Sequence, residues 1–383
     1  MSTFDADVAV IGLGAWGSTA LWRIAERGLD VIGFDSQTVP NQYGSSHGHT
    51  RLFRVACHEH VGLTPVARKA RDLWYELGKK TGKDLLHQTG VLSVGPENGR
   101  AIGTTRKAAA LANIPVVDLT VDEVRERYPQ HVGLGDHYVG LIDPEAGYVR
   151  VEEALASAIV AAAAAGARIY DRTAVTDVTE TGNGVRVSTA DATFLVRQVV
   201  LATGPWMSLM QDVVPLTVYR APMLWWQPRQ PNDPAFQLEN FPAFIRHYDD
   251  EHTIWGHGAT ANTPVKLGLS YDARSMVATN PDNLDRGINP YQDWGAVTDV
   301  IRWAVPGLDT TPVEAAPCMF TESPDNQFVI GRAPGRPRII LGGGCSGHGF
   351  KHAAAVGELL AQIACDEEPF ADIDFMNPNR FAN

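Results

Sequence analysis

The chain has 383 residues, of which 44% are hydrophobic and 20% charged, and its formal net charge is −12. This composition is typical of a globular protein, the length allows two domains, and the acidic balance disfavours nucleic acid and anionic membranes as partners. The four cysteines are widely spaced, no long apolar run is present and the first residues lack basic side chains, so we expect no disulfide framework, bound metal, membrane span or signal peptide, and a cytoplasmic location.

The first recognisable pattern lies in residues 6–35. Residues 7–11 form a β-branched run that predicts a buried strand, residues 18–27 repeat apolar side chains at helical intervals, and residues 31–34 predict a second strand. This order of strand, turn, helix and strand is the frame of a dinucleotide-binding unit.

Three glycines and one acid occupy the important positions of this frame. Gly12 allows a tight turn, Gly14 lets the backbone approach a pyrophosphate, and Gly17 lets the helix pack closely on the strand. The start of the helix offers free N–H groups to the phosphates. Asp35 ends the second strand, where its carboxylate can accept hydrogen bonds from a ribose. The frame therefore predicts a dinucleotide site, and it leaves FAD and NAD open.

A glycine-rich loop with histidines and arginines follows. Residues 50–56 look like the start of a helix or a strand, and Arg51 and Arg54 would share one face of a helix. Their place just after a dinucleotide site favours a functional role, and a solvated pair of surface arginines is the alternative. His47 and His49 have no acid or cysteine at ligand spacing, so we do not expect them to bind a metal.

The middle of the chain alternates helices and strands. The predicted helices are residues 66–80, 101–113, 121–128 and 151–165, and the strands are residues 89–96 and parts of 139–150 and 167–202, the last with an Asn-Gly hairpin. Thr120 has the form of a capping box at the start of the third helix. The strand at residues 198–202 ends at Gly204, where the backbone can approach a nucleotide a second time.

From residue 216 onward the chain contains short aromatic strands and several prolines, which favour an antiparallel sheet. Lys266 lies inside an otherwise apolar strand. An outward-facing lysine is the ordinary interpretation, whereas an inward-facing one would have a role beside a cofactor. Residues 287–303 run into a helix.

The last segment contains a second glycine-rich turn. Residues 338–341 predict an apolar strand, residues 342–349 are rich in glycine, and residues 350–364 predict a helix. Such a turn can present N–H groups and a helix dipole to the electron-rich edge of a bound ring. The two glycine-rich turns lie at opposite ends of the chain, so they can meet only if the middle contains an inserted domain.

Four segments carry a resemblance to a known family: GSSHGHTRLFR, TGVLSVGP, APCMFTESPDNQFVIG and CSGHGFK. In this order they resemble the monomeric sarcosine oxidase and N-methyltryptophan oxidase family of FAD-dependent amine oxidases, along nearly the whole chain. The resemblance implies a mixed α/β fold, a two-domain flavoprotein of the glutathione-reductase-like FAD-binding type with an antiparallel-sheet substrate domain. We expect the discontinuous FAD-binding domain at residues 1–85, 145–215 and 315–383, and the substrate domain at residues 86–144 and 216–314.

The resemblance also implies an activity. The expected enzyme is an FAD-dependent oxidase of secondary amines, N-methyl or N-alkyl α-amino acids that are sarcosine-like or bulkier, which forms an imine, then an aldehyde plus an amine, and hydrogen peroxide. The alternatives are an FAD-dependent dehydrogenase with another electron acceptor, an enzyme for a sugar-derived or specialised-metabolite amine, a nicotinamide-dependent enzyme, and a binding protein without catalysis. We expect a monomer whose partners are a small amine and molecular oxygen.

By the same resemblance, Cys318 would carry FAD through a thioether, Arg54 and Lys351 would hold the substrate carboxylate, and Lys266 would promote the reaction with oxygen. Arg51 completes the expected catalytic set and also lines the flavin. The residues expected to bind FAD are Gly12, Gly14, Gly17, Asp35, Ser45, His47, Thr50, Arg51, Val175, Gly204, Trp206, Cys318, Gly344, Gly347, His348, Gly349 and Lys351.

The chain departs from the family pattern at four positions in the substrate region, which are His49 in place of an acid, Trp255 and Phe320 in place of tyrosines, and Ser270 in place of a histidine. These differences disfavour sarcosine itself as the substrate. Trp225 and Trp226, together with Trp255, admit two interpretations: a bulky or aromatic substrate, or ordinary core packing.

Overall fold

The computed structural model describes residues 4–249, 252–270 and 274–382. Its first sheet has eight strands, and the centre is parallel because β1 runs in the same direction as both of its neighbours, β2 and β12. The strands are β1 (Ala6–Ile11), β2 (Val31–Phe34), β9 (Arg168–Tyr170), β10 (Val175–Glu180), β11 (Val185–Thr189), β12 (Thr193–Leu201), β19 (Val329–Ala333) and β20 (Arg336–Gly343).

Helices pack on one face of this sheet. They are α1 (Ala15–Glu26), α2 (Leu63–Thr81), α5 (Val151–Ala164) and α9 (Ala353–Ala364). Val8 and Val10 of β1 belong to the core that these helices share, whereas Ala9 and Ile11 join the core under the β10–β11 hairpin. Both faces of β1 are therefore covered, which explains why its sequence is a continuous apolar run.

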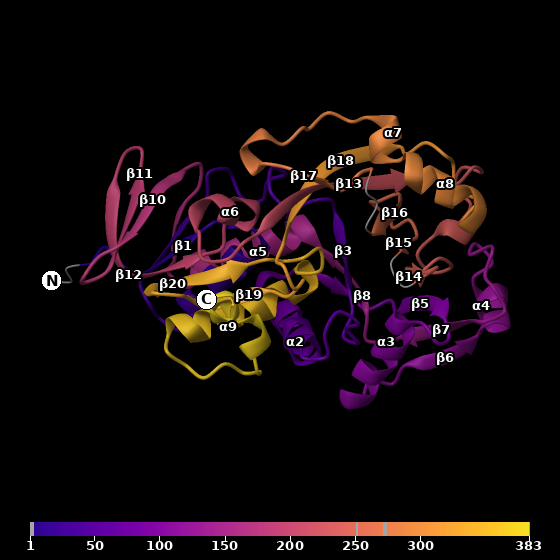
Figure 1. The fold of residues 1–383 in the computed structure, drawn as a ribbon, viewed down its shortest axis with the longest axis horizontal. Helices are drawn as coiled ribbons and strands as arrows, with labels where there is room; N and C mark the ends of the chain where they lie inside the picture. The colour runs from indigo at the N-terminus through magenta and orange to yellow at the C-terminus, as the bar shows by residue number, and fades with distance from the viewer. Residues whose placement is uncertain (1–3, 250–251, 271–273, 383) are drawn as a thin grey trace.

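The second sheet has nine strands and lies at the opposite end of the molecule from the N-terminus (Figure 1). It is antiparallel except where β14 pairs with β5. Its strands are β5 (Val91–Pro96), β6 (Val117–Thr120), β7 (Tyr138–Asp143), β13 (Thr217–Trp226), β14 (Ala243–His247), β15 (Thr253–His257), β16 (Val265–Ser270), β17 (Val277–Ala278) and β18 (Glu314–Glu322), and its helices are α3 (Arg100–Leu111), α4 (Val121–Arg127), α7 (Pro290–Asp293) and α8 (Gly295–Ala304).

A small third sheet stands between the two larger ones in Figure 1, with β8 (Gly147–Arg150) between β3 (Thr50–Phe53) and β4 (Leu86–His87). Residues 50–53 are thus a strand that ends before Arg54. Of the two alternatives for this segment, the strand is therefore correct, and the helix on which Arg51 and Arg54 would share one face does not form. In a strand, successive side chains point to opposite faces, so a spacing of three does not align two side chains.

The structure also tests other local elements that the sequence predicts. Thr120 Oγ1 accepts a hydrogen bond from Glu123 N at 3.2 Å, and Glu123 Oε2 accepts one from Thr120 N at 2.8 Å, which confirms the capping box. Residues 287–303 run into a helix as expected: the short α7 comes first, and α8 then extends to Ala304. The mixed α/β fold is confirmed.

The domain boundaries remain a prediction. Strand β18 pairs with β13, so residues 314–322 run in the antiparallel sheet, whereas the expected boundary assigns residues 315–322 to the FAD-binding part. No helix among the described residues is both long and apolar enough to cross a membrane.

Candidate active site

A cavity of about 970 Å³ has walls from both large sheets, and both glycine-rich turns open onto it. The expected FAD-binding residues on its wall are Gly12, Gly14, Asp35, Ser45, Thr50, Arg51, Val175, Gly204, Trp206, Cys318, Gly347, His348, Gly349 and Lys351, and two further expected catalytic residues, Arg54 and Lys266, line it as well. Gly17, His47 and Gly344 are not among the described wall residues. The fold thus brings distant predicted residues together around one space.

The first glycine-rich turn lies between β1 and α1. Gly12 has a φ of +85°, and a Cβ there would lie 2.6 Å from Ala202 O at the end of β12. A Cβ on Gly17 would lie 1.7 Å from Gly12 O, which shows how closely α1 packs on the turn. Asp35 accepts hydrogen bonds from Leu13 N at 2.8 Å and from Gln37 N. Its carboxylate is therefore fixed at the cavity wall next to the turn.

The wall fits FAD. Ser45 Oγ and Thr203 Oγ1 are buried hydroxyls that have no hydrogen-bond partner among the described residues. Both residues line the cavity, so a bound dinucleotide would supply the missing partners. Gly14 leaves space for a pyrophosphate, because a Cβ there would meet only Ser46 Oγ, at 3.4 Å.

Replacing Gly17 and Gly14 by alanine is expected to have different effects. Gly17→Ala forces a methyl group into the carbonyl of Gly12, so it should destabilise the folded chain by roughly 4 kcal/mol or more. Gly14→Ala fits the protein but occupies the approach of the phosphates, so it should leave the fold and weaken FAD binding. Thermal unfolding of the apoprotein and FAD titration measure the two effects. Equal melting temperatures for the two variants would contradict this account.

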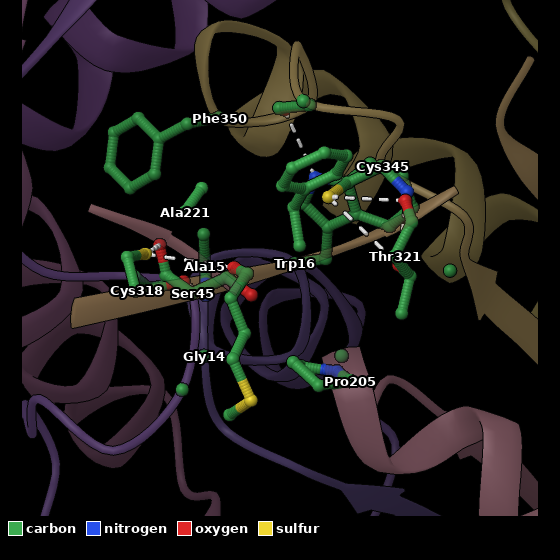
Figure 2. Close-up of a pocket in the computed structure, with 18 of the residues that line it drawn as sticks. Gly14, Ala15, Trp16, Ser45, Pro205, Ala221, Cys318, Thr321, Cys345 and Phe350 are labelled. Atoms are coloured by element: carbon green, nitrogen blue, oxygen red, sulfur yellow. Dashed lines mark hydrogen bonds between the residues drawn. The ribbon is translucent and has the colours of Figure 1, made fainter. Parts of the chain in front are cut away.

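The second glycine-rich turn joins β20 to α9. Positive φ angles at Gly344 and Gly347, +63° and +74°, bend the chain there. Trp16 Nε1, at the start of α1, donates a hydrogen bond to Gly349 O at 3.1 Å. Figure 2 shows the Trp16 indole directed toward this loop, next to Cys345. One side chain therefore links the two glycine-rich turns.

Cys318 lies on β18, buried, with its side chain beside Ser45 at the cavity wall (Figure 2). Its Sγ is 3.7 Å from Ser45 O and 3.9 Å from Arg51 Nη2. Burial raises the pKa of the Cys318 thiol, and the Arg51 guanidinium opposes this effect. Arg51 is also held by the carbonyls of Thr50 and Ser45. The thiol therefore faces the cavity next to a fixed positive charge.

Two cations converge on one carboxylate. Glu59 Oε1 accepts hydrogen bonds from Arg54 Nη2 at 2.7 Å and from Lys351 Nζ at 2.8 Å. Lys351 Nζ also donates to His348 O at 3.2 Å, and Arg54 Nη1 bonds His58 Nδ1 at 2.7 Å. Burial would raise the pKa of Glu59, but Arg54 and Lys351 hold that pKa well below its usual range. We call Arg54, Glu59 and Lys351 the carboxylate clamp.

Glu59 and His58 are functional candidates that the sequence motifs do not identify. Both follow Arg54 within five residues, in a loop without periodicity. An acid close after an expected carboxylate-binding arginine was the available signal for Glu59. Nothing in the sequence indicated that His58 would accept a hydrogen bond from Arg54.

Lys266 points inward and is 1% exposed. Its Nζ donates to Gly48 O at 2.7 Å and to Thr50 O at 2.8 Å, and it lies 5.1 Å from the centre of the Trp225 ring. Burial lowers the pKa of Lys266 well below the usual value, whereas the carbonyls and the ring face favour the ammonium form. The outward-facing interpretation is wrong.

The three tryptophans divide into two groups. Trp225 and Trp226 are fully buried, and Trp226 donates from Nε1 to Leu267 O at 3.0 Å. Core packing is therefore the correct interpretation for these two. Trp255 is half-buried and lines the cavity.

The fold and the cavity are those of an FAD-dependent oxidoreductase, and comparison with known proteins agrees. Residues 7–363 match the model of the FAD dependent oxidoreductase (DAO) family, so the chain belongs to this family. It is 31% identical over 377 residues to N-methyl-L-tryptophan oxidase of Yersinia pestis and of Yersinia pseudotuberculosis, covering 98% of this chain and 100% of each relative. The family expected from the sequence motifs is confirmed.

Solved structures share the fold. NikD, an unusual amino acid oxidase essential for nikkomycin biosynthesis, aligns with a TM-score of 0.83 and 23% identity over 97% of both chains. L-proline dehydrogenase from P. horikoshii aligns with a TM-score of 0.83 and 21% identity, over 98% of this chain and 97% of that one. Glycine oxidase from Geobacillus kaustophilus aligns with a TM-score of 0.79 and 19% identity over 99% of both chains. These similarities confirm the expected two-domain flavoprotein fold.

Proposed function

We propose that this FAD-dependent enzyme oxidises secondary amines that bear a carboxylate, N-methyl or other N-alkyl α-amino acids, with oxygen as the electron acceptor. The observation that carries the proposal is the carboxylate clamp, in which Arg54 and Lys351 bind the same oxygen of Glu59. A pair of cations that already binds one carboxylate in the cavity is equipped to bind that of a substrate.

The charge of the clamp suits a monoanion. Two cations and one carboxylate leave a net charge of +1, which a substrate carboxylate would neutralise. Lys351 has three N–H donors, and Glu59 and His348 use two of them. The guanidinium of Arg54 has five donors, and its hydrogen bonds to His58 and Glu59 leave others for a ligand.

Bound FAD would accept the two electrons that the amine loses. Arg54 and Lys351 would fix the carboxylate, so that the carbon to be oxidised has one orientation in the cavity. Lys266 would hold a positive charge where negative charge develops as oxygen is reduced. The resulting imine would react with water to give an aldehyde and an amine, and oxygen would take up two electrons and two protons to form hydrogen peroxide. The name of the curated relative supports an N-methyl amino acid as the substrate.

An amine screen tests the proposal. The FAD-loaded enzyme is mixed without air with N-methyl amino acids and with the matching amides, and its visible absorbance is followed before and after air is admitted. We expect bleaching by the acids, recovery in air and peroxide formation. Bleaching by the amides alone would contradict a carboxylate-bearing substrate. Bleaching that air does not reverse, but a dye does, would instead support a dehydrogenase, an activity for which L-proline dehydrogenase of the same fold provides the precedent.

We further propose that FAD is attached to Cys318 through a thioether, because this thiol faces the cavity beside Arg51. Acid precipitation of the wild-type enzyme should leave the yellow colour in the pellet, whereas in Cys318→Ala the colour should move to the supernatant. Cys345→Ala is the matched control, since Cys345 also lines the cavity. Extractable FAD in the wild type, or in the Cys345→Ala control alone, would contradict the assignment.

A further inference from the structure

One connection of the antiparallel sheet reaches over to the first sheet. Strand β17 pairs with β13, and the chain between β17 and α7 extends toward the first sheet before it returns to α7 (Figure 1). We call this connection, residues 279–289, the strap. Four of its residues line the cavity: Pro281, Asp282, Leu284 and Arg286. The strap therefore borders the same space as the two glycine-rich turns.

Two contacts join the strap to loops of the first sheet. Trp206 Nε1 donates a hydrogen bond to Asp282 Oδ1 at 2.7 Å. Arg286 donates from Nη2 to Tyr43 O at 2.8 Å and from Nη1 to Gln42 O at 3.3 Å, and its guanidinium carbon lies 5.0 Å from the centre of the Tyr43 ring. Trp206 and Tyr43 line the cavity too, so each contact joins two parts of its wall. We call these contacts the two latches.

The Arg286 latch lies beside the expected site of the phosphates. Tyr43 belongs to the loop that runs to Ser46, and Ser46 Oγ accepts a hydrogen bond from Ala15 N at 3.1 Å, at the start of α1. Ser45, whose buried hydroxyl has no partner among the described residues, lies in the same loop. The N-terminus of a helix attracts phosphates. The strap is thus fastened to a loop that borders the expected pyrophosphate site.

The strap is fixed more firmly to its own sheet. Arg220, on β13, is 4% exposed and donates from Nε to Asp285 O and from Nη2 to Gly287 O, both at 2.8 Å. Its guanidinium also pairs with the buried Asp293 of α7. The strap side chains of the two latches, by contrast, are exposed. Exposed contacts are weak because water competes for the same groups. The latches can therefore open while the strap stays attached to the antiparallel sheet.

We propose that Asp282 and Arg286 control the exchange of FAD: they latch the strap over the cavity, and FAD enters and leaves only while both latches are open. The latches form between protein groups alone, so they do not require the cofactor. They should therefore slow association and release together and leave the dissociation constant nearly unchanged. The inference needs only the binding of FAD and is independent of the amine that is oxidised.

The rates of FAD exchange test this inference. They are measured in Cys318→Ala, in which the cofactor can leave whether or not Cys318 binds it covalently. The change in FAD fluorescence is followed after mixing with the apoprotein, for association, and after dilution of the loaded protein, for release. Asp282→Ala and Arg286→Met each remove one latch. Each should raise both rate constants about threefold to fivefold, and the double variant should raise them about tenfold or more.

A second pair of exposed, oppositely charged side chains provides the control. Asp299 and Arg302 of α8 form an ion pair at 2.8 Å, and neither is among the described wall residues. Asp299→Ala with Arg302→Met should leave both rates unchanged, and melting temperatures of the apoproteins check folding. Unchanged rates in the double latch variant would overturn the inference. Faster release with unchanged or slower association would also overturn it, because the two side chains would then bind FAD itself.

A double-mutant cycle tests the Asp282 latch separately. Trp206→Phe keeps an aromatic ring but lacks the N–H donor. If Asp282 acts through this hydrogen bond, Asp282→Ala should not change the exchange rates further in the Trp206→Phe background. Equal effects of Asp282→Ala in both backgrounds would show that Asp282 does not act through Trp206, and this latch would be wrong.

Discussion

Replacing Lys266 by methionine is expected to slow the reaction of the reduced enzyme with oxygen about 10²- to 10³-fold, while reduction by the amine changes far less. Methionine keeps much of the side-chain volume but removes the buried charge that the Gly48 and Thr50 carbonyls and the Trp225 ring hold in place. Oxygen gains negative charge as it is reduced, so a fixed, buried ammonium group at the cavity wall lowers the barrier to this step. Oxidation of the amine places no negative charge on the amine, so that half-reaction depends less on the lysine.

The two half-reactions are measured separately by stopped-flow absorbance, with the melting temperature as the check on folding. Lys266→Arg retains the charge and is the matched control, which should react with oxygen faster than the methionine variant. A wild-type rate with oxygen in Lys266→Met would show that the lysine does not promote this step.

The rate at which the reduced enzyme reacts with oxygen should also depend on pH, in a direction set by the pKa of Lys266. Burial lowers the pKa of Lys266 well below the value of 10.5 of a free lysine, so the ammonium group loses its proton below pH 10.5. The rate of the wild-type enzyme with oxygen should therefore fall as the pH rises through this lowered pKa. The rate of Lys266→Met should lack this fall, because methionine does not titrate.

The sequence predicted the nucleotide-binding unit well because its pattern is local. In residues 6–35, a strand covered on both faces, a glycine turn and an amphipathic helix follow one another directly. The helix nevertheless begins at Ala15, three residues earlier than its apolar repeat suggested, because α1 starts inside the glycine turn. The strand order of the second sheet could not be predicted from the sequence. Strand β5 pairs in parallel with β14, from a distant part of the chain, and no local pattern indicates such a pairing.

In the candidate site, too, residues in local motifs could be predicted, whereas contacts between distant segments could not. The glycines, Asp35 and the cavity-facing Cys318 belong to recognisable segments. The carboxylate clamp joins Glu59 to Lys351, 292 residues apart, through contacts that only the fold creates. Lys266 illustrates the limit most clearly, since a lysine in an apolar strand can face either way. Carbonyl acceptors from the loop before β3 and from β3 itself, both distant in sequence, favour the inward position.

Replacing Arg54 by methionine should raise KM for carboxylate-bearing amines about 10²- to 10³-fold, with the reaction of the reduced enzyme with oxygen largely retained. In this variant Lys351 and Glu59 remain as a neutral pair, so the clamp loses the net positive charge that attracts a carboxylate. The matching amides are the control substrates. They have no carboxylate for Arg54 to bind, so their KM should change much less. An unchanged KM for the acids would show that Arg54 does not bind the substrate carboxylate.

A second substitution tests the charge argument itself. Glu59→Gln in the Arg54→Met background leaves Lys351 as the charged member of the clamp, which restores the net charge of +1. Glutamine still offers a carbonyl oxygen to Lys351, so the cation is not left without an acceptor. We therefore expect the double variant to bind acetate more tightly than Arg54→Met alone, by about tenfold, as measured by absorbance titration of the FAD-loaded enzyme. Acetate binding that weakens further in the double variant would instead mean that Glu59 supports the clamp through its hydrogen bonds, and that net charge does not set the affinity for carboxylates.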